Sequence, residues 1–117
     1  MIKERNPNRV TIMVVEGLDK KLRDYQSKII RQTQSSFSYS RALNTKLSIG
    51  LRSRKKVDQY EYLDGEKRRV TVMFDRDVLK KIKLEFGRHI IDCANDYCEM
   101  PSWSFSKEVD KHLRRAF

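Results

Sequence analysis

Two short segments of the chain carry the same three hydrogen-bonding or polarisable side chains at alternate positions. Residues 9–14 read RVTIMV and residues 69–74 read RVTVMF. An Arg guanidinium donates through a planar fork of N–H groups, a Thr hydroxyl donates and accepts, and a Met side chain offers an apolar contact. Alternate residues of a β-strand lie on one face, so each segment would present its three side chains together. These residues are Arg9, Thr11, Met13, Arg69, Thr71 and Met73.

A second group with possible chemistry is His89, Cys93 and Asp96, which recur at helical spacing and could in principle hold a metal ion. A structural metal site needs four ligands, however, and no partner pair stands elsewhere in the sequence. Cys93 also belongs to an apolar stripe, so core packing explains it better. The sequence contains no glycine-rich phosphate loop and no nucleophile–base pattern. We therefore expect neither an enzyme nor a bound cofactor.

The residues between the repeated polar positions are apolar and define the opposite face of each segment. They are Val10, Ile12 and Val14 in the first copy and Val70, Val72 and Phe74 in the second. This period of two predicts amphipathic β-strands at residues 9–14 and 69–74. A single such strand is not stable alone, so we expect the two copies to pair.

Two helical patterns follow each predicted strand. Apolar residues at spacings of three and four define the first helix of each unit. They are Leu18, Leu22, Tyr25, Ile29 and Ile30 in the first unit, and Leu79, Ile82, Phe86, Ile90, Cys93 and Tyr97 in the second. The second helices are expected within SYSRALNTKLSIGL (38–51) and SFSKEVDKHLRRAF (104–117). Ser38 is a good N-cap, and Gly50 is placed to end its helix.

The two units align along most of their length, which indicates a duplication. The strands match at an offset of 60 (69 − 9), and the last helices match at an offset of 66 (106 − 40). One insertion of six residues (66 − 60) around 92–101 accounts for the difference. The predicted organisation is a flexible basic arm at 1–8, a first unit at 9–51, a basic linker at 52–68 and a second unit at 69–117. Both units would share one core.

Composition narrows the class of partner. The chain has 117 residues, 38% hydrophobic and 36% charged, which is typical of a small folded domain. Its 26 Lys and Arg against 16 Asp and Glu give a net charge of +10, which attracts polyanions and favours nucleic acid. The alternative, that the excess cations only solubilise the surface, stays open.

Cysteine usage and hydropathy bear on the compartment. Cys93 and Cys98 are too few for a disulfide framework and lack zinc-site spacing, which indicates reduced thiols in a cytoplasmic protein. The sequence shows no charged-then-apolar leader and no long apolar span. We therefore expect neither secretion nor contact with a membrane.

Strand, helix, loop and helix in about forty residues, with a Ser-x-Ser start to the last helix, resembles the ribbon-helix-helix DNA-binding family. RVTIMV and SYSRALNTKLSIGL carry the resemblance in the first unit, and RVTVMF and SFSKEVDKHLRRAF in the second. The resemblance implies a mainly α fold with a short two-stranded antiparallel β-ribbon, ordered β-α-α-β-α-α. A chain with two units resembles the tandem, pseudo-dimeric members, such as TraY-type plasmid-transfer accessory proteins and archaeal-virus regulators.

The resemblance also implies which residues contact DNA bases. In the family, the ribbon enters the major groove of double-stranded DNA. Arg9, Thr11 and Met13, with Arg69, Thr71 and Met73, would then contact base edges. The repeated triad implies a pseudo-palindromic or direct-repeat-like DNA site. Met departs from the polar residue usual at the third position, and an exposed edge with only polar decoration is the alternative.

Phosphate contacts are implied at the start of the last helix of each unit, where free N–H groups and the helix dipole favour an anion. The implied residues are Ser38, Tyr39, Ser40 and Arg41 in the first unit, and Ser104, Phe105, Ser106 and Lys107 in the second. Plain N-capping is the alternative role of these serines.

Further cations could add nonspecific attraction to DNA. They are Lys3, Arg5, Arg54, Lys55, Lys56 and Arg68. If roughly 6–10 phosphates are neutralised, affinity should fall by about 10³–10⁵ between low and moderate salt. A solvated linker that makes no DNA contact is the alternative.

The sequence therefore predicts a sequence-specific DNA-binding protein, with transcriptional repression as the leading role. A relaxosome accessory protein, which binds a plasmid transfer origin and contacts a relaxase, would use the same DNA surface. An antitoxin-type interaction module is the lesser alternative, since Phe117 ends the second unit without a tail to wrap a toxin. We expect a monomer at low concentration, with possible self-association on DNA.

Overall fold

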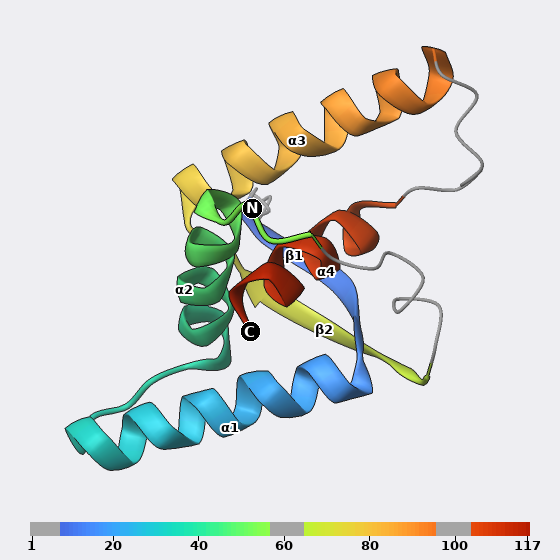
Figure 1. Ribbon diagram of the computed structural model, residues 1–117. Helices are drawn as coiled ribbons and strands as arrows, with labels where there is room; N and C mark the ends of the chain where they lie inside the picture. The colour runs from blue at the N-terminus through green and yellow to red at the C-terminus, as the bar shows by residue number, and fades with distance from the viewer. Residues whose placement is uncertain (1–7, 57–64, 96–103) are drawn as a thin grey trace, which may run out of the picture.

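The computed structural model describes residues 8–56, 65–95 and 104–117, with the backbone alone for 89–95. The elements of these residues occur in the order β-α-α-β-α-α, as the sequence predicts (Figure 1). They are β1 (Arg9–Val15), α1 (Glu16–Thr33), α2 (Tyr39–Arg52), β2 (Lys67–Met73), α3 (Arg76–Asn95) and α4 (Phe105–Ala116). In Figure 1, α1 and α3 lie on opposite sides of the β-ribbon, and α2 and α4 lie between them.

The two strands form an antiparallel ribbon, which confirms the predicted pairing. Thr11 lies opposite Thr71 in the third of the seven pairs, with Arg9 opposite Met73 and Met13 opposite Arg69. Strand β2 begins at Lys67, two residues before the predicted start and inside the predicted linker. Backbone pairing explains this extension, because ladder hydrogen bonds need no apolar side chain on the added residue.

The predicted alternation of faces is present in both strands. Ile12 and Val14 of β1 and Val72 of β2 are buried, whereas Thr11 and Thr71 are exposed. The buried faces belong to one hydrophobic cluster, to which both units contribute. Its helical members include Leu22, Leu43, Leu47, Ile82, Val109 and Leu113.

The first helix of each unit follows its strand closely. Helix α1 begins at Glu16, directly after β1, and includes Gly17. On its predicted stripe, Leu18 and Leu22 are buried, but Ile30 is 38% exposed, because the end of α1 extends past the core. Of the stripe predicted for the first helix of the second unit, Ile90 and Cys93 lie where the structure describes the backbone alone, and Tyr97 lies outside the described residues.

Helix α2 begins with the predicted N-cap but does not end where the sequence predicts. The Ser38 hydroxyl accepts a hydrogen bond from the Arg41 N–H at 3.1 Å, as an N-cap should. Gly50 does not end α2, which continues to Arg52. A Cβ at Gly50 would lie 1.8 Å from the His112 carbonyl oxygen of α4. Gly50 therefore lets α2 and α4 cross closely, which is a packing role that helix-ending signals do not reveal.

No helix within residues 8–56, 65–95 and 104–117 is both long and apolar enough to cross a membrane.

Candidate nucleic-acid interface

The outer face of the ribbon carries the repeated triads. Arg9, Thr11, Arg69 and Thr71 are exposed, and Met73 is 43% exposed, whereas Met13 is half-buried. The Thr11 and Thr71 hydroxyls lie 2.9 Å apart and share a hydrogen bond. Since a hydroxyl has one donor and two acceptor positions, the pair retains a donor and acceptors for a ligand.

The register pairs one residue of the first unit directly with its equivalent in the second unit. Thr11 and Thr71 are separated by the repeat offset of 60 (71 − 11), and they are also direct partners in the ladder. Arg9 and Arg69 lie on either side of this pair, each two positions away along the ladder. In the register, an Arg is therefore paired with a Met on each side of the Thr pair.

The N-termini of α2 and α4 are tied to the two edges of the ribbon through matched serine hydroxyls. Ser40 accepts a hydrogen bond from the Met73 N–H at 3.0 Å, and Ser106 accepts one from the Met13 N–H at 3.0 Å. These bonds satisfy strand N–H groups that face away from the partner strand. The family resemblance implies that both serines contact DNA phosphates. In the structure, their hydroxyls instead accept hydrogen bonds from the backbone of the ribbon.

The other residues expected at these helix starts are divided between surface and core. Ser104 caps α4 by accepting from the Lys107 N–H at 3.2 Å, as Ser38 caps α2. Arg41 is exposed, and its guanidinium carbon lies 5.3 Å from the centre of the Phe37 ring. Phe105, in contrast, packs edge-to-face against Phe74 and Phe86, so its ring belongs to the core side.

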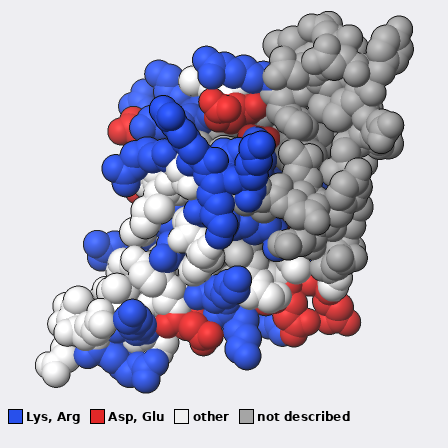
Figure 2. Space-filling model, in the orientation of Figure 1, with Lys and Arg blue, Asp and Glu red and all other residues white. Residues whose placement is uncertain are grey.

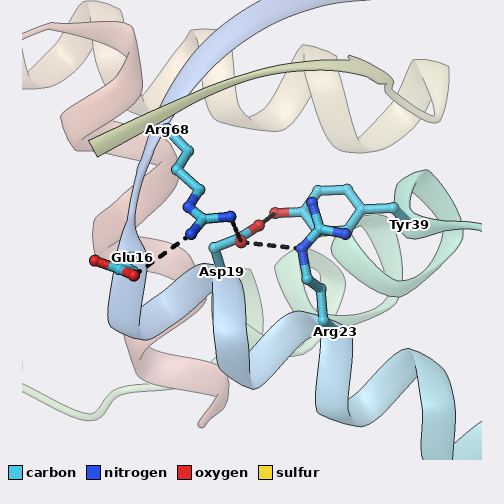
Figure 3. Close-up of polar contacts among 5 residues, drawn as sticks. All are labelled: Glu16, Asp19, Arg23, Tyr39 and Arg68. Atoms are coloured by element: carbon cyan, nitrogen blue, oxygen red, sulfur yellow. Dashed lines mark hydrogen bonds and ion pairs between the residues drawn. The ribbon is translucent and has the colours of Figure 1, made fainter. Parts of the chain in front are cut away.

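Tyr39 also faces inward, toward a buried carboxylate on α1 (Figure 3). Its hydroxyl donates to Asp19 Oδ1 at 2.8 Å, and Arg23 Nε donates to Asp19 Oδ2 at 3.0 Å. Burial, followed by the hydrogen bond to Asp19, raises the pKa of Tyr39 above its ordinary value. The hydrogen bond to Asp19 also raises the pKa of Arg23. Asp19 is 2% exposed, and these partners satisfy its charge.

Arg68 completes this cluster from β2. Its guanidinium lies 3.4 Å from Glu16 Oε1 and 4.0 Å from Asp19 Oδ2 (Figure 3). Its partner in the ladder is the buried Val14, so Arg68 projects from the helix side of the ribbon, opposite the face that carries Thr71. The structure therefore separates Arg68 from the residues expected to contact DNA bases.

Asn44 is an organising residue that sequence reasoning did not identify. Its Nδ2 donates to the carbonyl oxygens of Ser40 (2.8 Å) and Met73 (2.9 Å), and its Oδ1 accepts from the Asp75 N–H at 2.9 Å. Asn44 thus joins α2 to the turn between β2 and α3. Its repeat partner at the offset of 66 is Asp110. A short polar residue at the same place in both apolar stripes is therefore the sequence feature that could have identified Asn44.

The cations after α2 have different environments. Arg54, Lys55 and Lys56 are exposed, and Lys55 Nζ donates to the Phe117 carbonyl oxygen at 3.1 Å. Lys3 and Arg5 lie outside the described residues. Figure 2 shows Lys and Arg side chains covering more of the visible face than Asp and Glu, as the net charge requires.

The trio considered as a possible metal site falls on residues whose side chains the structure does not describe. The side chains of His89 and Cys93, and all of Asp96, lie outside the described residues. Among the side chains that are described, no group of three or more His, Cys, Asp or Glu is arranged to hold a metal ion.

Comparison with known proteins found no matching family model, no matching curated protein and no matching solved structure.

Proposed function

We propose that this protein binds double-stranded DNA sequence-specifically, by inserting the β1–β2 ribbon into the major groove. The observation that carries the proposal is the register. It sets Thr11 opposite Thr71 and arranges both triads on one exposed face. The major groove of B-DNA, about 12 Å wide, admits a two-stranded ribbon.

The chemistry of the outward face fits base edges. Each Arg can donate two hydrogen bonds to the O6 and N7 atoms of guanine, and each Thr can donate or accept. Each Met can contact a thymine methyl group. In this proposal the two units act as a pseudo-dimer within one chain. Such a pseudo-dimer favours an inverted, pseudo-palindromic site over a direct repeat.

The backbone N–H groups at the starts of α2 and α4 supply the proposed phosphate contacts. Ser40 and Ser106 hold these helix ends beside the ribbon edges, which is where the DNA backbones flank the groove. Arg41 adds an exposed cation at one of these ends. Such contacts set the register of the protein on DNA without reading its sequence.

Transcriptional repression is the biological role that we propose, because a ribbon bound at a promoter would exclude polymerase from it. The same DNA surface could serve at a plasmid transfer origin. Mapping the bound site relative to promoters and transfer origins distinguishes the two roles.

Selection of duplexes from a random library at a fixed, stated salt concentration, followed by footprinting, tests the proposal. We expect an inverted pair of related half-sites protected by one chain. The double variant Arg9→Ala/Arg69→Ala should lose this preference, whereas Lys20→Ala/Lys21→Ala, with the same change in charge, should retain it. Failure to select any preferred sequence would contradict the proposal and leave only nonspecific attraction to polyanions.

A further inference from the structure

A hollow of about 400 Å³ lies where β1 begins, against the first half of α3. It is lined by Asn8, Arg76, Leu79, Lys80, Lys83 and Leu84. Leu84 is 54% exposed, which makes it the most exposed of the large apolar side chains among the described residues. The hollow therefore combines an apolar floor with a rim of cations.

The equivalent place at the other end of the ribbon holds an ion pair. There, at the repeat offset of 60, Asp19 stands in place of Leu79 and Arg68 in place of Asn8. The long Arg68 side chain reaches the Asp19 carboxylate and occupies the space with an ion pair. Asn8 is too short to do so, and Leu79 offers it no charge. Because of these two differences, the hollow lacks the ion pair that its counterpart contains.

The same comparison shows a difference in charge. Arg76 replaces Glu16, and Leu84 replaces Asp24, at the offset of 60. The hollow thus carries three cations and no acidic residue, whereas its counterpart carries three of each sign. Among described residues, no ion pair joins Arg76, Lys80 or Lys83 to a carboxylate. A positive field with an exposed Leu beneath it is complementary to an acidic segment that carries a large apolar side chain.

The hollow also lies on the side of the ribbon away from the proposed DNA-binding face. The Phe74 N–H donates to the Asn8 carbonyl oxygen at 2.8 Å, which continues the register of the ladder by one pair. Residues paired across a ladder point to the same side, and Phe74 is 2% exposed within the core. Asn8 therefore belongs to the helix side. A ligand in the hollow would leave Arg9 and Thr11 accessible.

We propose that this hollow is a docking site for an acidic, apolar segment of a partner protein, which the DNA-bound chain can hold at the same time. A Leu-sized side chain of the partner would cover Leu79 and Leu84, and its Asp or Glu residues would pair with Arg76, Lys80 and Lys83. Docking at one end only would give the complex a direction along an otherwise pseudo-symmetric site. The site does not depend on DNA binding, so it can be measured without DNA.

The test uses the full chain and a short fluorescent peptide of Glu, Asp and Leu, with a peptide of equal charge in which Ser replaces Leu. Fluorescence anisotropy should show saturable binding of the first peptide and much weaker binding of the second. Lys80→Glu/Lys83→Glu should weaken binding at least about tenfold. Lys20→Glu/Lys21→Glu, the matched control on α1 with the same change in net charge, should have a much smaller effect. Heteronuclear NMR should place the shift changes at residues 79–84.

Three outcomes would overturn the proposal. Equal losses in the two charge-reversal variants would mean that the peptide responds only to the overall field. If Leu84→Ser binds the peptide as tightly as the natural chain does, the apolar floor takes no part in binding. A larger loss of duplex affinity in Lys80→Glu/Lys83→Glu than in its control, with peptide binding intact, would assign the rim to flanking DNA. Circular dichroism and thermal unfolding of each variant verify that these exposed substitutions leave the fold intact.

Discussion

Arg9 and Arg69 occupy equivalent places on the outer face of the ribbon, one on each strand and on either side of the Thr11–Thr71 pair. Neither forms an ion pair with another described residue, so both guanidinium groups are available to a ligand. If an Arg contacts a base, the loss of DNA-binding affinity on removing its side chain depends on the DNA sequence. If it contacts a phosphate, the loss is the same for every sequence.

For the selected DNA site, Arg69→Ala should cost about 1–3 kcal/mol of binding free energy and relax specificity at one position. Arg9→Ala should relax the symmetric position in the other half-site. Competition binding with single-base variants of the site measures both effects. Arg31→Ala, at an exposed position in the last turn of α1, is a control with equal loss of charge. A loss that is uniform across DNA sequences for Arg9 and Arg69 would identify phosphate contacts.

Tyr39 illustrates a residue whose role depends on its buried partner. Tyr39→Phe should lower the free energy of unfolding by about 0.5–1.5 kcal/mol, because it removes the hydrogen bond to Asp19. The ring itself should remain accommodated, since Phe105 occupies the equivalent position of the second unit. Urea denaturation measures the difference. Tyr25→Phe is the control, because the Tyr25 hydroxyl makes no hydrogen bond to a described residue, and an equal loss there would contradict this assignment.

The same residue predicts a dependence of stability on pH. The pKa of Tyr39 is raised above its ordinary value of 10.0, so the folded state opposes its ionisation. Its contribution is fully present below that value and is lost as pH rises above it, because the unfolded chain then releases the proton more readily. The free energy of unfolding should therefore decline more steeply in alkaline solution for the natural chain than for Tyr39→Phe. Parallel declines would contradict the prediction.

Among the elements, the turn from β2 into α3 depends on a side chain of α2. Asn44→Ala should destabilise the fold by about 1–3 kcal/mol, because it leaves the Met73 carbonyl and the Asp75 N–H without their partner. Thr45→Ala is the control, since Thr45 is exposed and should change stability by no more than about 0.5 kcal/mol. Thermal unfolding compares the two. Equal effects would show that the turn is held by other contacts.

The crossing of α2 and α4 is the element-scale feature most sensitive to volume. Gly50→Ala should cost about 1–3 kcal/mol or more, because its Cβ would lie 1.8 Å from a backbone oxygen that cannot rotate away. Gly87→Ala, in α3, meets no described atom within 4 Å and should instead stabilise the helix by about 0.5–1 kcal/mol. Chemical denaturation measures the change in the free energy of unfolding for both variants. The two changes should have opposite signs if the helices cross as described, and the same sign if they do not.

At the scale of the whole molecule, the two largest contact surfaces join the two units. The ribbon takes one strand from each, α2 packs on α4, and the hydrophobic cluster includes Leu43 of one and Leu113 of the other. Neither unit alone can bury its apolar faces, so the chain should unfold in one cooperative step. Circular dichroism and the NMR signals of β1 and α3 should give coincident transitions, and light scattering should give the single-chain mass of 14.0 kDa. Two transitions, or an obligate dimer, would contradict this arrangement.

Much of this fold was predictable from particular residues. The alternation in RVTIMV and RVTVMF predicted the strands and their faces, and Ser38 predicted the start of α2. Gly50 was misread because a glycine that ends a helix and a glycine that admits a neighbouring helix look alike in sequence. Arg68 was counted with the linker cations, although its strand position directs it toward Asp19.

The sequence by itself determined what depends on local periodicity and on repetition: strand faces, helix stripes, element order and net charge. Backbone geometry sets those periods, so they can be read without knowledge of distant residues. Only the tertiary structure decided that Thr11 meets Thr71, that Ser40 and Ser106 hold the ribbon, and that the two ribbon ends differ. These features depend on which distant side chains and backbones are brought within contact distance, and local periodicity carries no information on that.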